Sequence, residues 1–147
     1  MALDGIVVSN IVAELNANLA GARIAKIAQP EADELLLTLK SPNSGQVRLL
    51  LSASASLPLI YFTSVNKPSP VTAPAFCMLL RKHIGGGKIM RVYQPGLERI
   101  IHFEIEHLNE MGDLCRKDLV LELMGKHSNL IFCDDNALSR SQTVSLQ

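Results

Sequence analysis

The chain is dominated by short apolar segments, each ending at a cluster of turn-forming residues. Four of them occupy residues 23–28, 34–40, 46–52 and 59–63, and four more occupy residues 88–93, 99–106, 118–124 and 130–133. The cluster Ser41-Pro42-Asn43-Ser44-Gly45 is typical of the breaks between them. Short segments joined by such tight turns predict strands of an antiparallel meander.

A helix is predicted before the first strand, over residues 4–20. Valine and leucine recur in it at helical spacing, at Val8, Val12, Leu15 and Leu19. These residues therefore line one face. Asp4 stands at the N-cap, where its carboxylate can accept from backbone donors, and Gly21 stands where a left-handed residue ends many helices.

A second helix is predicted over residues 76–84, ending at Gly85-Gly86-Gly87. One face is expected to carry Phe76, Leu79, Leu80 and His83. Arg81 and Lys82 would leave the helix on the opposite face, where they could contribute to a cationic patch or to an ordinary solvated surface.

These elements predict one α+β domain over residues 1–135. It is expected to be an antiparallel β-sandwich or flattened barrel, with the first helix packed on it. Residues 136–147 are polar and lack periodicity, so a disordered tail, frayed or left by truncation, is predicted.

Composition restricts the class of protein. The chain has 147 residues, of which 48% are hydrophobic, enough to bury a core and to exclude intrinsic disorder. No apolar run approaches the roughly 18–20 residues that span a bilayer. The N-terminal residues include Asp4 and no basic residues, so no secretory signal is expected. The cysteines Cys77, Cys115 and Cys133 are widely spaced, so neither disulfides nor a zinc site is expected. A cytoplasmic location with reduced thiols fits best.

The sequence offers no convincing catalytic, cofactor or metal site. Gly85-Gly86-Gly87-Lys88 follows a helix and precedes a strand, and Ile89 stands where a P-loop has its hydroxyl. The four histidines have no metal-ligand spacing, and no nucleophile motif is present. We therefore expect a protein that is not an enzyme and that needs no cofactor or metal.

Charge alone does not indicate nucleic-acid binding. The 14 basic and 14 acidic residues give a formal net charge of zero. A domain that binds nucleic acid through overall positive charge should be more basic. Any such binding must come from a local patch.

Four segments are more distinctive than the fold requires: Leu3-Asp4-Gly5, residues 76–83, residues 94–101 and residues 122–129. In this order they resemble the N-terminal domain of the NFACT family. That family includes bacterial RqcH-like proteins, also called fibronectin-binding protein A-like, and eukaryotic NEMF-like proteins. The resemblance extends to about Asp134. It also implies a fold similar to the N-terminal domain of formamidopyrimidine-DNA glycosylases.

The resemblance implies a role in ribosome quality control. Family members bind large ribosomal subunits that still carry peptidyl-tRNA. They recruit charged tRNA, chiefly alanyl-tRNA in bacteria, so that the stalled chain gains a template-free alanine tail. The partners implied are thus the large subunit and tRNA, with no membrane. The further domains of the family do not fit within 147 residues.

The resemblance also implies which residues handle RNA: Asp4, Glu98, Arg99, Glu122, Leu123 and Met124. Glu98 replaces the aspartate that the family usually has. Their structural alternatives are a helix cap for Asp4, a surface ion pair for Glu98 and Arg99, and core packing for Leu123 and Met124. Four further candidates are cationic or polar: Arg81, Lys82, Lys126 and His127.

Two rival functions remain. A glycosylase-like nucleic-acid enzyme would need an N-terminal proline nucleophile followed by glutamate, where this chain has Ala2-Leu3. A fibronectin-binding surface adhesin would need an export signal or an anchor, and none is evident.

Overall fold

The computed structural model describes residues 4–42, 45–54, 58–64, 67–68, 70–124, 128–134 and 142–145. Two helices, α1 (Gly5–Leu19) and α2 (Ala75–Ile84), accompany nine strands. In the first part of the chain the strands are β1 (Arg23–Ala28), β2 (Glu34–Ser41), β3 (Gly45–Ser52) and β4 (Leu59–Thr63). The others are β5 (Lys88–Tyr93), β6 (Ile100–Leu108), β7 (Leu114–Glu122), β8 (Asn129–Asp134) and β9 (Gln142–Ser145).

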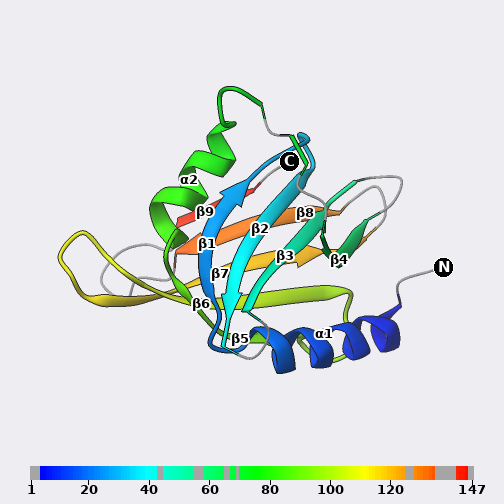
Figure 1. Ribbon diagram of the computed structural model, residues 1–147. Coiled ribbons are helices and arrows are strands. Elements are labelled where there is room, and N and C mark those ends of the chain that lie inside the picture. The colour runs from blue at the N-terminus through cyan, green and yellow to red at the C-terminus, as the bar shows by residue number, and fades with distance from the viewer. Residues whose placement is uncertain are drawn as a thin grey trace.

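The strands form one antiparallel sheet in the order β4-β3-β2-β1-β5-β6-β7-β8-β9. The sheet folds back on itself between β1 and β5, so β1–β4 lie across β6–β8 as a second layer (Figure 1). The predicted α+β class and the antiparallel arrangement are confirmed. The two layers come from a single folded sheet, with β4 and β9 as its edges. The likeness to glycosylase N-terminal domains stays a prediction.

The bend between the two halves of the sheet is bridged by a very short strand pairing between β1 and β5. Arg23 opposite Lys88 is the register pair that joins β1 to β5. Beside it, Ile24 N–H donates to Gly87 O at 2.9 Å and Ile89 N–H donates to Ala22 O at 2.8 Å. Gly87 is necessary here, because a Cβ would lie 2.9 Å from both the Ile105 side chain and Ile84 O.

The core lies between the two halves and is mostly aliphatic. Leu35, Leu37 and Leu39 of β2 are at most 1% exposed, as are Ile101, Phe103 and Ile105 of β6. α1 adds its predicted face, Val8, Val12, Leu15 and Leu19. Each fully buried aliphatic side chain contributes about 1.5–3 kcal/mol relative to an exposed one. A shared core therefore joins the halves, although few backbone hydrogen bonds do.

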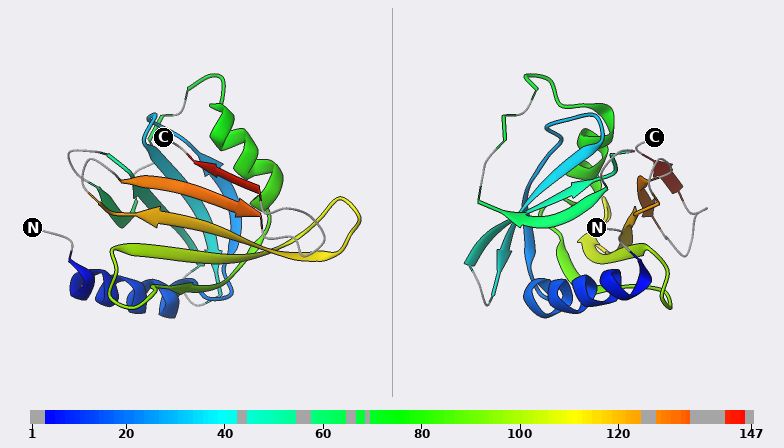
Figure 2. Two further views of the ribbon diagram at one scale, coloured as in Figure 1. Left: turned by 180° about the vertical axis from the view of Figure 1, so that it is seen from behind. Right: turned by 90° about the vertical axis from the view of Figure 1, so that its right-hand side faces the viewer.

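α1 lies along β5, as Figure 2 shows, and its predicted ends are confirmed. Asp4 is the N-cap, and Gly21 follows the helix with a φ of 88°. Asn16, on the same helix, accepts the Val92 N–H of β5 at 2.8 Å. The helix therefore satisfies a donor on a strand edge that β1 does not reach.

Three expectations differ from the structure. The buried face of α2 is Phe76, Cys77, Leu80 and Ile84, not the face with Leu79 and His83. The β6–β7 hairpin is longer than expected, because pairing continues to Leu108 opposite Leu114. Residues 142–145 form β9 on the edge of β8, so the prediction of a disordered tail is wrong for these four residues.

Candidate functional site

Three of the distinctive segments meet at one end of the sheet. The first turn of α1, the loop between β5 and β6, and the end of β7 lie on the left of the first view in Figure 2. We call this region the motif end and define it by Asp4, Gly5, residues 94–99 and residues 122–124. Six of its residues are those that the resemblance implies in RNA handling: Asp4, Glu98, Arg99, Glu122, Leu123 and Met124. The fold brings them to one end of the sheet.

Asp4 has the capping role that its position predicts. Its Oδ1 accepts the Ile6 N–H at 3.1 Å and the Val7 N–H at 2.9 Å. Because the residue is exposed, the carboxylate remains accessible to a partner. A cap of this kind stabilises a helix by about 1 kcal/mol.

Gln94 fixes the start of α1 to the β5–β6 loop. Its Nε2 donates to Gly5 O at 3.0 Å and to Glu98 O at 2.6 Å. The approach is so close that a Cβ on Gly5 would lie 1.8 Å from Leu97 O. Gln94 was not among the predicted site residues, although it lies inside one of the distinctive segments, and its role is to position this loop.

Glu98 and Arg99 both have exposed side chains at the motif end. Among the residues that the structure describes, neither forms an ion pair, so the alternative of a surface salt bridge between them is not what is observed. Arg99 lies just before β6, and its carbonyl accepts the Leu123 N–H at 2.9 Å. Its backbone is thus held while its guanidinium stays in solvent.

The segment after β7 separates into core and surface. Leu123 is 1% exposed and belongs to the core, so its side chain does not reach a partner, and its part in the site is the bond to Arg99. Glu122 and Met124 are half-buried. Met124 N–H donates to Ser128 Oγ at 2.9 Å, which closes the β7–β8 loop. Lys126 and His127 lie outside the described residues.

Arg81 and Lys82 point to different parts of the molecule. Arg81 Nε donates to Ile27 O of β1 at 2.8 Å. Lys82 Nζ lies 4.0 Å from Glu110 of the β6–β7 hairpin, and both side chains are largely exposed. The structure therefore does not gather these two residues with the motif end or with each other.

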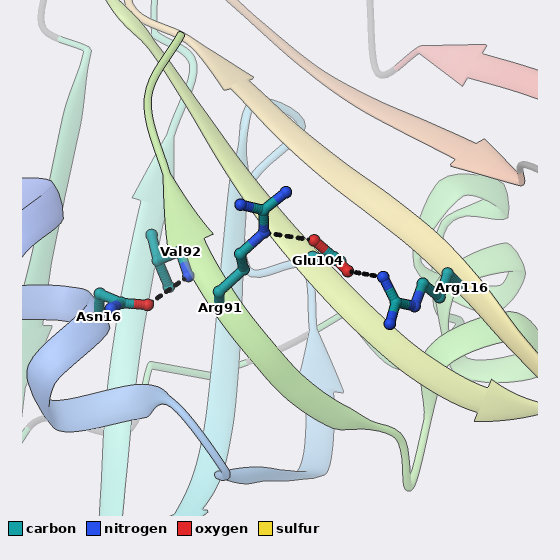
Figure 3. A network of polar contacts seen from close by, with 5 residues as sticks. All are labelled: Asn16, Arg91, Val92, Glu104 and Arg116. Carbon is teal, nitrogen blue, oxygen red and sulfur yellow. Dashed lines mark hydrogen bonds and ion pairs between the residues drawn. The ribbon is translucent and has the colours of Figure 1, made fainter.

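A network of paired charges covers the outer face of β5–β7, away from the core (Figure 3). Glu104, whose side chain is 11% exposed, accepts from Arg91 Nε at 2.5 Å and from Arg116 Nη1 at 2.8 Å. The hydrogen bond to Glu104 raises the pKa of Arg91. The Arg91 guanidinium also lies 4.1 Å from the centre of the Tyr93 ring, which stacks on His102. These arginines are thus engaged within the domain.

Within the described ranges, no group of three or more histidine, cysteine, aspartate or glutamate side chains could hold a metal ion. No helix among the described residues is long and apolar enough to cross a membrane. Cys77 is buried, and this burial raises the pKa of its thiol.

Two proteins of known name are similar to this chain in sequence. Rqc2 homolog RqcH of Bacillus subtilis is 41% identical over 134 residues, which are 91% of this chain and 23% of that protein. Ribosome quality control complex subunit NEMF of Homo sapiens is 27% identical over 124 residues, 84% of this chain and 11% of that protein. The chain thus spans less than a quarter of the length of these two relatives.

Solved structures share the fold at similar identity. The N-terminal domain of fibronectin-binding protein PavA from Streptococcus pneumoniae has a TM-score of 0.91 and 34% identity, over 99% of this chain and 54% of that one. The N-terminal part of the fibronectin/fibrinogen-binding protein from Streptococcus suis has a TM-score of 0.92, with the same identity and coverage. The family model described as NFACT N-terminal and middle domains matches residues 4–143. The chain therefore belongs to the NFACT family, as its distinctive segments predict.

Proposed function

We propose that this chain is the N-terminal domain of a ribosome quality control factor and that its motif end contacts RNA. In this role it helps a larger protein to bind large ribosomal subunits that carry peptidyl-tRNA. It also recruits alanyl-tRNA for template-free tailing of the stalled chain, in the cytoplasm. The domain has no active site of its own and supplies binding and orientation.

The observation that carries this proposal is the state of Arg99. Its guanidinium is exposed and has no ion pair among the described residues, while its backbone is fixed by Leu123. An arginine presented in this way can donate several hydrogen bonds to a phosphate or a base edge. Glu98 beside it can accept from a base amino group. The names of the RqcH and NEMF relatives support the ribosomal context.

Arg99→Ala tests the proposal in a full-length factor that carries this domain. The substitution removes a solvent-exposed cation and no core packing, so the free energy of unfolding should change by only about 0.5 kcal/mol. Alanine tailing and tRNA association should fall sharply. Glu98→Ala should act in the same direction, and Glu98→Asp should be tolerated because it restores the residue usual in the family.

Arg116→Ala is the matched control, because it removes an exposed arginine from the outer face of β7 rather than from the motif end. It should leave tailing close to the wild-type level. An Arg99→Ala protein that is clearly less stable yet tails normally would show that the residue has a structural role and would contradict the proposal.

Fibronectin binding is the second candidate, because the solved neighbours carry that name. It can be tested by surface plasmon resonance of the 147-residue chain over immobilised fibronectin. Saturable binding that survives Arg99→Ala would favour this candidate. The chemical objection to a glycosylase still holds, because Ala2 stands where such an enzyme needs its proline nucleophile.

A further inference from the structure

The zero net charge conceals a strong asymmetry along the chain. Between Ala20 and Leu97 there are nine basic residues and three acidic ones, while the remaining positions hold five basic and eleven acidic residues. The first of these regions contains β1–β5 and α2. A local positive surface can therefore exist in a protein with no net charge.

Two adjoining hollows lie on the outer face of β1–β3, the side opposite the core. One has a volume of about 650 Å³ and includes Lys26, Lys67 and Arg81 in its lining. The other has a volume of about 350 Å³ and includes Lys26, Lys40 and Arg48. Ala25, Lys26 and Thr38 line both hollows, so the hollows adjoin and are treated together as one groove. We call it the basic groove and define it by its five cations.

An irregularity in β1 creates part of this groove. The register shifts between Ile24 and Lys26, which is the mark of a β-bulge. Ile24 and Ile27 are both buried, whereas Ala25 and Lys26 are both exposed. The bulge thus keeps two isoleucines in the core and leaves Ala25 and Lys26 both facing the groove.

The sheet register brings cations of neighbouring strands close together, in and beside the groove. Thr38 of β2 pairs with Lys26 on one side and with Arg48 on the other. At the next position on this face, Arg23 pairs with both Lys40 and Lys88. Like charges directly opposite each other destabilise a sheet. The arrangement therefore lowers the stability of the fold, and a role in stability does not explain why it is present.

These cations have few acidic partners. In the described part of the chain, the only ion pair involving the basic groove joins Lys67 to Glu34 at 2.9 Å. Lys26, Lys40 and Arg48 have none, and Arg48 Nη1 reaches only the carbonyl of Ser64, at 3.4 Å. Arg81 is held at the groove through its Nε, which leaves the two outer nitrogens of its guanidinium for another acceptor.

We propose that the basic groove binds the phosphodiester backbone of a single-stranded RNA segment, at a site separate from the motif end. Several cations gathered along one groove can neutralise successive phosphates of such a backbone. No motif-end residue lines the groove. The choice of RNA as the polyanion rests on the proposed function, whereas the anion site itself rests on the geometry.

The test measures binding of the 147-residue chain to a fluorescein-labelled uridine oligomer of about 16 nucleotides, by anisotropy over a range of salt concentrations. Lys26→Gln combined with Arg48→Gln should weaken binding about tenfold at low salt. The slope of log K against log salt should decrease by about 0.7 for each lost phosphate contact. Lys26→Arg combined with Arg48→Lys keeps the charge and should bind within about twofold of the wild type.

Arg91→Gln combined with Arg116→Gln is the charge-matched control on the other half of the sheet, and glutamine can still donate to Glu104. This control should bind nearly as the wild type does. Circular dichroism melts of each variant check that it is folded. The proposal is wrong if the folded groove variant binds like the wild type, or if the control weakens binding equally.

Two further outcomes decide between alternatives. If phosphatidylserine vesicles bind through the same residues at least as tightly as the oligomer, the occupant is a lipid surface and the proposal fails. The oligomer assay contains neither ribosomes nor tRNA. Binding here, combined with failure of the full-length factor to engage stalled subunits, would refute the proposed function and leave the groove as an RNA site.

Discussion

On the outer face of β5–β7 the arginines surround a carboxylate, whereas on the outer face of β1–β3 the cations lie opposite one another. Arg91 and Arg116 both donate to Glu104, but Arg23 has Lys40 and Lys88 as its register partners. The same residue types therefore serve internal pairing in one half of the sheet and are left for solvent or a ligand in the other. Net charge says nothing about this division, and the register reveals it.

The largest expected effect tests whether the two halves are one cooperative unit. Phe103, on β6, is fully buried between them. Phe103→Ala should lower the free energy of unfolding by about 3–5 kcal/mol, because it removes packing and leaves a cavity. Phe103→Leu should cost less than about 1.5 kcal/mol. Urea titration with circular dichroism measures both.

The two tyrosines allow each half to be followed separately. Tyr61 lies on β4 and Tyr93 on β5, and the chain has no tryptophan. Tyr61→Phe and Tyr93→Phe variants each retain one fluorophore, and their unfolding transitions should coincide. Transitions at clearly different urea concentrations would mean that the halves unfold independently.

The next effect concerns the paired half. Glu104→Gln keeps the size of the side chain but removes the charge that both arginines contact, so we expect a loss of about 1 kcal/mol, less than for a fully buried pair because the arginines are largely exposed. Thermal melts should show that the loss shrinks when Arg91→Gln and Arg116→Gln are also present. Strictly additive losses would mean that the network does not act as a unit.

The smallest effect concerns the unpaired half and has the opposite sign. Lys40→Gln removes one of the two cations opposite Arg23, so the domain should gain about 0.3 kcal/mol at low salt. The gain should disappear as salt screens the repulsion. A loss of stability at low salt would show that Lys40 has a stabilising contact after all.

The sequence predicts most elements of the fold to within one or two residues, because hydrophobic periodicity and turn residues are local signals. It does not predict how α2 is rotated. Cys77 and Leu79 are both apolar, and only the position of α2 against β1, where the Cys77 thiol lies 3.5 Å from Ile27 O, determines which of them is buried.

Features that depend on distant backbone partners are also missed. β9 joins the sheet through the open edge of β8, a pairing that its own polar sequence does not indicate. Lys117 is 5% exposed and donates to His83 O at the end of α2, at 3.0 Å. Its sequence neighbours, Arg116 and Asp118, give no sign that this one charge is buried.

The motif end is predictable because its residues lie in distinctive segments, whereas the basic groove is not. The groove cations come from β1, β2 and β3, from the segment after β4 and from α2. No two of the five are adjacent in sequence. Strand register and the β1 bulge bring them together, and neither feature follows from composition.

The clamp between Gly5 and the β5–β6 loop has a consequence for the order of events during synthesis. Gln94, which holds the Gly5 carbonyl, is translated 89 positions after it. α1 can coil as soon as it emerges, yet the clamp on its first turn cannot form until Gln94 has been translated. The first helix of this domain is thus clamped late, and a pause before Gln94 would leave its apolar stripe exposed to non-native contacts.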